Sequence, residues 1–168
     1  MADPHIKSPM DFWDYLTAII YRSGFVLATI MLIYLAFNQE IAQIGLLISA
    51  TMLASSLHLY MKSFRLIFQF AMWIGLFCFI FGLPHLALGA TFLTIGGLCY
   101  KEYFCFRIFG LNLQPILLAA LWLSLTFHIE LVSNILIVFC SLLLALLSIQ
   151  KWRMPLHFDI GDKTKYQI

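Results

Sequence analysis

Residues 100–107, YKEYFCFR, form the densest patch of polar residues in the interior of this sequence. Long apolar runs flank the patch on both sides, and four aromatic residues are interleaved with its charged and thiol-bearing members, Lys101, Glu102, Cys105 and Arg107. A basic patch between two apolar runs is typical of a connection between membrane-spanning helices. The patch therefore predicts a water-facing connection between one span that ends near residue 100 and another that begins near residue 111.

The overall composition indicates a protein embedded in a lipid bilayer. Of the 168 residues, 62% are hydrophobic and only 11% are charged, and the mean hydropathy is +0.94. Soluble domains typically carry about 25% charged residues, and apolar runs of this length would leave a large hydrophobic surface facing water. The net charge of +2 comes without a basic stripe, so we expect no nucleic-acid partner.

Neither the first residues of the sequence nor its cysteines favour a secreted protein. The first 14 residues carry three Asp and one Lys, with no small-residue cleavage pattern behind the first apolar run, so we expect no cleavable signal. The four cysteines include no C-x-x-C pair, and a disulfide framework is not expected.

Six apolar segments approach the roughly 20 residues that a membrane-spanning helix needs. They cover residues 15–37, 41–60, 64–81, 84–100, 111–127 and 131–149. We therefore predict an all-α, polytopic bundle of six transmembrane helices within residues 1–150, followed by a cytoplasmic tail at 151–168. The tail contains Trp152, Leu156, Phe158 and Ile160, so we expect it to dock on the bundle or on the membrane surface.

The fourth segment has a stripe of small residues, Ala90, Thr94 and Gly97, at helical spacing. Such a stripe lets the backbone of another helix approach closely. The same glycines could instead reflect the higher glycine content of membrane helices in general. Both interpretations stay open at the level of sequence.

The distribution of basic residues predicts the orientation. Six spans place both termini on the same side, and all ten Lys and Arg residues fall on that side or at its interface: Lys7, Arg22, Lys62, Arg65, Lys101, Arg107, Lys151, Arg153, Lys163 and Lys165. The loops on the other side hold Glu40 and Glu130. Since Lys and Arg in short loops mark the cytoplasmic face, we expect cytoplasmic termini and a multi-pass protein of the bacterial inner membrane.

This topology brings seven candidate residues to the cytoplasmic leaflet: Arg22, His58, Cys99, Lys101, Glu102, Cys105 and Arg107. A carboxylate at membrane depth is costly unless it is paired. Arg22 and Glu102 lie at the same predicted depth, so we predict an ion pair between them that holds the first span against the connection after the fourth.

A weaker hypothesis assigns a metal or redox site to Cys99 and Cys105 with His58 or His157, because thiolate and imidazole groups bind zinc, copper or iron. The two cysteines are six residues apart, which is no recognised ligand spacing. They can equally be small apolar fillers. We therefore expect neither a metal nor another cofactor.

No catalytic motif is present, whether a nucleophile elbow, a phosphate loop or an H-E-x-x-H zinc motif. The sequence favours a scaffold, assembly or interaction protein with a protein partner at its aromatic cytoplasmic patch. One alternative is a small transporter or channel with a cavity lined by Thr91, Thr94, Ser124 and Asn134. A second alternative is the membrane redox or metal-binding protein that the cysteines suggest.

Three stretches together resemble a family of uncharacterised bacterial integral membrane proteins, one of the domain-of-unknown-function families. They are YRSGF at 21–25, GATFLTIGGLCYKEYFCFR at 89–107 and PLHFDIGD at 155–162. The likeness spans most of the chain. It implies a multi-span inner-membrane fold, and no catalytic residue follows from it.

Overall fold

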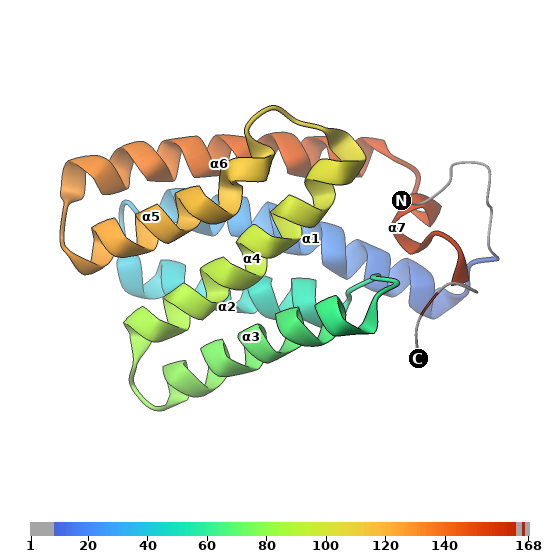
Figure 1. Ribbon diagram of the computed structural model, residues 1–168, viewed down its shortest axis with the longest axis horizontal. Helices are drawn as coiled ribbons and strands as arrows, with labels where there is room; N and C mark the ends of the chain where they lie inside the picture. Colours follow the sequence, from blue (N-terminus) through green and yellow to red (C-terminus); the bar gives the residue numbers. More distant parts are fainter. Residues whose placement is uncertain (1–8, 164–165, 167–168) are drawn as a thin grey trace.

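The computed structural model describes residues 9–163 and 166, and every regular element among them is a helix. Six long helices run back and forth along the length of the molecule (Figure 1). These are α1 (Phe12–Tyr34), α2 (Gln39–Ser55), α3 (Lys62–Ile80), α4 (Pro84–Phe106), α5 (Gln114–Thr126) and α6 (Glu130–Arg153). A 3-10 turn, η1 (Leu111–Leu113), precedes α5, and the short α7 (His157–Ile160) follows α6. The predicted all-α class is confirmed.

The helix ends follow local signals in the sequence. The Asn38 side chain accepts a hydrogen bond from the backbone N–H of Ile41 at 3.1 Å and so caps the start of α2. Pro84 opens α4, where its missing N–H costs nothing because the first turn has no partner for it. Gly82 and Gly110 have φ of 73° and 84°, a left-handed conformation that glycine adopts without a steric penalty.

Helix α4 is longer than predicted. It continues through the charged patch to Phe106 and ends at Arg107, whose φ of 49° is left-handed. The connection was predicted to begin at residue 101, whereas in the structure it begins after Phe106. Residues 101–106 contain no Gly or Pro to end the helix, and tertiary contacts compensate their charges. Helix α6 likewise continues past residue 149 to Arg153.

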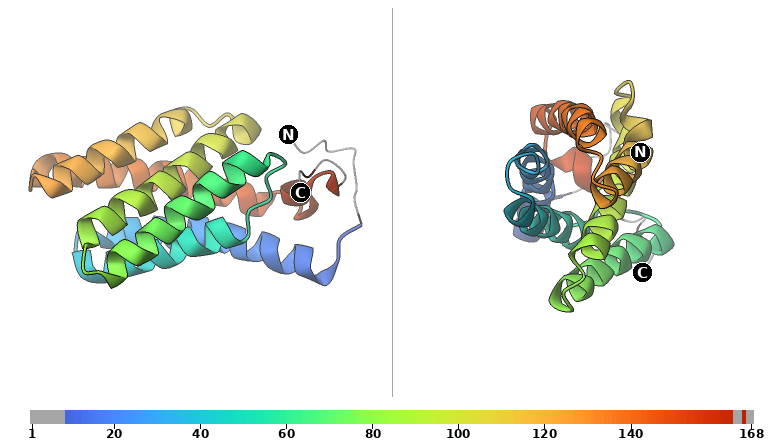
Figure 2. Two further views of the ribbon diagram at one scale, coloured as in Figure 1. Left: turned by 60° about the horizontal axis from the view of Figure 1, so that its bottom comes forward. Right: turned by 90° about the vertical axis from the view of Figure 1, so that its left-hand side faces the viewer.

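The helices form one bundle around a shared apolar core. Helix α1 packs against α2 and α6, while α4 packs against α2, α3 and α5. Helix α3 lies at the edge of the bundle, as the end-on view in Figure 2 illustrates, with only Ala71, Met72 and Gly75 buried. The outward faces carry many exposed large apolar side chains, including Phe70, Ile80 and Phe81. Helices α1, α3 and α6 are each long and apolar enough to cross a membrane.

Glycines in α4 allow close contacts with two of its neighbours, α5 and α3. A Cβ atom added at Gly96 would lie 2.9 Å from the Cα of Pro115 in α5. One added at Gly97, a member of the predicted stripe, would lie 2.2 Å from a ring carbon of Phe68 in α3. Both distances are shorter than real Cβ contacts allow, which favours the close-approach interpretation of the small residues over a compositional one.

Basic residues gather at one end of the bundle. Lys7 and Lys165 lie outside the described residues, and the other eight Lys and Arg residues belong to a single end. This positive end comprises the beginnings of α1 and α3, the ends of α2, α4 and α6, and α7 (right-hand side of Figure 1). The opposite end holds Glu40 and Glu130, each in the first turn of its helix.

Candidate functional site

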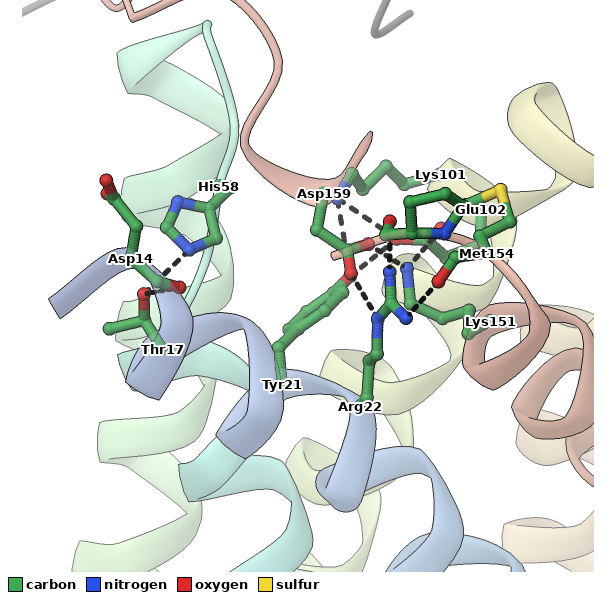
Figure 3. A network of polar contacts seen from close by, with 11 residues as sticks. Asp14, Thr17, Tyr21, Arg22, His58, Lys101, Glu102, Lys151, Met154 and Asp159 are labelled. Atoms are coloured by element: carbon green, nitrogen blue, oxygen red, sulfur yellow. Dashed lines mark hydrogen bonds and ion pairs between the residues drawn. The ribbon is translucent and has the colours of Figure 1, made fainter. Parts of the chain in front are cut away.

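A buried carboxylate lies at the centre of the positive end. Glu102, in the last turns of α4, has 2% of its side chain exposed. Its Oε1 atom accepts a hydrogen bond from the Tyr21 hydroxyl at 2.7 Å and lies 3.0 Å from the Nζ atom of Lys101. Its Oε2 atom accepts a hydrogen bond from Nζ of Lys151 at 2.9 Å (Figure 3). Three donors from three helices therefore compensate the burial of this charge.

A second carboxylate, that of Asp159 in α7, joins the C-terminal segment to the same cluster. Its Oδ1 atom accepts a hydrogen bond from Nζ of Lys151 at 2.7 Å, and its Oδ2 atom accepts one from Nε of Arg22 at 2.5 Å. The terminal nitrogens of Arg22 donate to the carbonyl oxygens of Met154 at 2.6 Å and Pro155 at 2.9 Å. The guanidinium group thus holds the chain that leads from α6 to α7 at three points, which its planar fork of donors permits.

The cluster is nearly neutral in its interior. Arg22 and Lys151, each 1% exposed, balance Glu102 and Asp159, which are 2% and 5% exposed. Lys101 adds one further positive charge at the edge, where 24% of its side chain is exposed. We call these five residues and Tyr21 the ionic cluster. Because each buried charge has an opposite partner, the cluster avoids the cost of an isolated charge in an apolar core.

Aromatic rings surround the ammonium group of Lys151. Its Nζ atom lies 4.8 Å from the ring centroid of Tyr21, 5.6 Å from that of Phe106 and 5.9 Å from that of Phe25. The negative face of an aromatic ring attracts a cation within about 6 Å. These rings therefore stabilise a fully buried lysine in addition to its two carboxylate partners.

The predicted ion pair between Arg22 and Glu102 is wrong in its partners. In the described part of the chain Arg22 pairs with Asp159, and Glu102 pairs with Lys101 and Lys151. Arg22 and Glu102 do belong to one cluster, linked through Lys151 and Asp159. The prediction expected residues 151–168 to dock on the bundle or on the membrane surface but named no charged contact for them, and so omitted the lysine and the aspartate that lie between the two predicted partners.

Sequence reasoning missed Tyr21, Lys151 and Asp159, although a signal for two of them was present. The three stretches that carry the family resemblance contain Tyr21 and Arg22, then Lys101 and Glu102, then Asp159. All of these belong to the ionic cluster, so segments far apart in sequence that share a family signature meet at one place. Lys151 had no such signal, because it looks like an ordinary basic residue that follows a span.

Of the other candidates, His58 lies close to the cluster and Arg107 does not take part in it. His58 follows α2, and its Nε2 atom is 3.0 Å from the Thr17 hydroxyl. Burial lowers the pKa of His58, and the positive charge of Lys101 adds to the shift. Arg107 is exposed beyond the last turn of α4.

The structure does not bring the predicted metal ligands together. Cys99 is buried whereas Cys105 is exposed, and a separation of six residues places them roughly 120° apart around α4. Within residues 9–163 and 166, no group of three or more His, Cys, Asp or Glu side chains is arranged to hold a metal ion. The hypothesis of a metal site therefore receives no support from the geometry.

Three of the four residues expected to line a transport path donate hydrogen bonds within their own helices. The hydroxyls of Thr91 and Thr94 donate to carbonyl oxygens one turn earlier in α4, at 2.8 and 3.0 Å. Ser124 donates to Leu121 O at 2.9 Å. Asn134 is exposed at the opposite end, beside a separate surface pocket. These contacts give the transporter alternative no specific support.

A pocket of about 320 Å³ opens beside the ionic cluster. It lies between the α2–α3 connection, the end of α4 and the C-terminal segment. Its polar lining comprises His58, Tyr60, Lys101, Glu102, Cys105 and Asp159, and its apolar lining includes Leu59, Met61, Phe104 and Met154. Of the three cations in the cluster, Lys101 is the one that lines this pocket.

Comparison with known proteins identifies a family of membrane proteins and a similar bacterial protein. A family model described as uncharacterized integral membrane protein (DUF2301) matches residues 82–168, which include α4 to α7. A protein of Haemophilus influenzae, described as an uncharacterized protein, is 60% identical over 168 residues, covering 100% of both chains. No solved structure matches the chain.

Proposed function

Because this chain belongs to a family of uncharacterized integral membrane proteins (DUF2301), we propose that it is a six-span inner-membrane protein that serves as a scaffold, assembly or interaction partner. Both termini face the cytoplasm in this proposal, and the positive end presents a rigid surface to a protein partner. The observation that carries the proposal is the ionic cluster, which fastens the C-terminal segment to the bundle.

The length and direction of the helices support six spans. At 1.5 Å per residue the 23 residues of α1 extend about 35 Å, enough for a hydrocarbon core of about 30 Å. The 17 residues of α2 extend about 25 Å, and η1 with the 13 residues of α5 extends about as far, a mismatch that local thinning of the bilayer accommodates. With six antiparallel helices the basic residues form one face, and that face is cytoplasmic by the positive-inside rule.

Single cysteines introduced at the two ends test this topology. In a variant without native cysteines, we expect a membrane-impermeant maleimide added to intact spheroplasts to label Glu130→Cys and to spare Phe109→Cys. Both positions are exposed, so both should react after the membrane is permeabilised. Labelling of position 109 in intact spheroplasts would contradict the proposed orientation.

The interaction role rests on the rigidity of the positive end. Besides the ionic cluster, Lys163 pairs with Asp11 at 2.7 Å and with Asp14, and the Asp162 N–H donates to the Tyr60 hydroxyl at 2.8 Å. A surface that is ordered before binding loses less entropy when a partner docks. Close to it Phe109, between α4 and η1, is 98% exposed, and a large aromatic side chain is a common anchor in interfaces.

A photo-crosslinking amino acid at position 109 tests this role. At native expression we expect one discrete protein adduct, whose yield falls when Arg22→Met releases the C-terminal segment. The matched control is position 81 at the opposite end, where Phe81 is 75% exposed, and only lipid adducts are expected. Equal protein adducts at both positions, or none at position 109 in wild-type cells, would rule out the proposed docking surface.

A further inference from the structure

The ionic cluster leaves one of its donors available to a ligand. The cluster contains three cations, Arg22, Lys101 and Lys151, and two carboxylates, so its net charge is +1. The exposed member is Lys101, whose Nζ atom contacts Glu102 at 3.0 Å and donates to the Tyr21 hydroxyl at 3.3 Å. An ammonium group has three donors. Glu102 and Asp159 also line the wall of the pocket, but the buried Arg22 and Lys151 balance their charges from behind it. The third donor and the unbalanced charge therefore both belong to Lys101.

An apolar groove continues from this pocket onto the outer face of the bundle. The groove has a volume of about 210 Å³ and lies between α3 and α4. It shares Leu59, Met61, Lys101 and Phe104 with the pocket, and its other lining residues are Phe64, Phe68, Gly97 and Tyr100. Lys101 is the charged residue in this lining. Lys101 therefore lies where the polar pocket meets an apolar groove on the outer face of the bundle.

We propose that pocket and groove together bind an anionic phospholipid, with its phosphate at Lys101 and one acyl chain in the groove between α3 and α4. Lys101 is complementary to the headgroup charge, and the shared lining residues connect the headgroup position to the hydrocarbon position. A water-soluble phosphate compound would use the pocket alone and would gain nothing from the groove. This inference relies on the membrane location of the chain and is independent of the number of spans and of any protein partner.

Lipid titration of the purified full chain, followed by native mass spectrometry, tests the site. We expect dioleoylphosphatidylglycerol to bind at least fivefold more tightly than dioleoylphosphatidylcholine, because one lysine contributes about 1 kcal/mol toward an anionic lipid surface. Lys101→Gln should remove this preference. The matched control, Arg153→Gln, removes an exposed charge from the same end outside the pocket and should keep it. Equal affinity for the two lipids in the wild-type protein would overturn the proposal.

Two further measurements use the wild-type chain, so they do not depend on how well a variant folds. Glycerophosphoglycerol, which lacks acyl chains, should fail to displace bound phosphatidylglycerol at equal concentration. Effective displacement would instead identify a site for soluble phosphate compounds. Phosphatidylglycerol with a photoreactive acyl chain should label peptides within residues 64–68 and 97–104. Labelling confined to other faces of the bundle would also overturn the proposal.

Discussion

Glu102→Gln is expected to lower the free energy of unfolding by about 3–5 kcal/mol, the usual cost of removing one partner from a buried ion pair. The substitution keeps the shape of the side chain but leaves the buried Arg22 and Lys151 with Asp159 as their shared carboxylate. The measurement is equilibrium unfolding of the purified protein in detergent micelles. Glu130→Gln, at an exposed position in the first turn of α6, is the control and should cost less than about 1 kcal/mol.

A double substitution distinguishes loss of charge balance from loss of packing. Glu102→Leu with Lys151→Met removes one buried charge of each sign and leaves Arg22 paired with Asp159. Replacing a buried pair by apolar residues of similar volume is often close to neutral. We therefore expect the double variant to be more stable than either single variant. If the loss in the free energy of unfolding of the double variant equals the sum of the two single losses, the two side chains do not act as a pair.

Arg22→Met is expected to release the C-terminal segment from the bundle. It removes three hydrogen bonds, to Asp159 and to the carbonyl oxygens of Met154 and Pro155. Asp159 then keeps Lys151 as its one cationic partner in the cluster. A loss of about 3 kcal/mol in the local opening free energy corresponds to about a hundredfold faster cleavage by a protease that attacks the opened segment. Chymotrypsin cleavage after Phe158, followed by intact mass, measures this rate.

Two variants make the protease experiment specific. Arg153→Met removes an exposed arginine near the same segment and should leave the cleavage rate unchanged. Arg22→Lys keeps the charge but lacks the planar fork that reaches three acceptors, so its rate should lie between those of wild type and Arg22→Met. A cleavage rate in Arg22→Met equal to that of wild type would mean that other contacts hold the segment in place.

Helix ends that depend on local turn residues were predicted well from the sequence. The end of α4, which depends on side-chain contacts between helices, was not. Asn38, Gly82 and Pro84 mark turns through local backbone preferences, and the structure places helix ends beside each of them. The end of α4 was predicted too early, because charges at Lys101 and Glu102 look like the end of a span when their partners are unknown. Once Tyr21 and Lys151 supply those partners, the helix continues through the patch.

The sequence by itself determined that the protein is an all-α membrane protein, where its helices lie along the chain, and that its basic residues gather at one end of the bundle. These properties depend on composition, on the lengths of apolar runs and on local turn residues, all of which can be read along the chain. Only the tertiary structure decided that residues 100–106 belong to a helix, that Glu102 pairs with Lys151, and that Arg22 holds Asp159. Pairing at 2.5–3.0 Å depends on how the helices are rotated and on where the C-terminal segment docks. The spacing of charges along the chain carries no information about either.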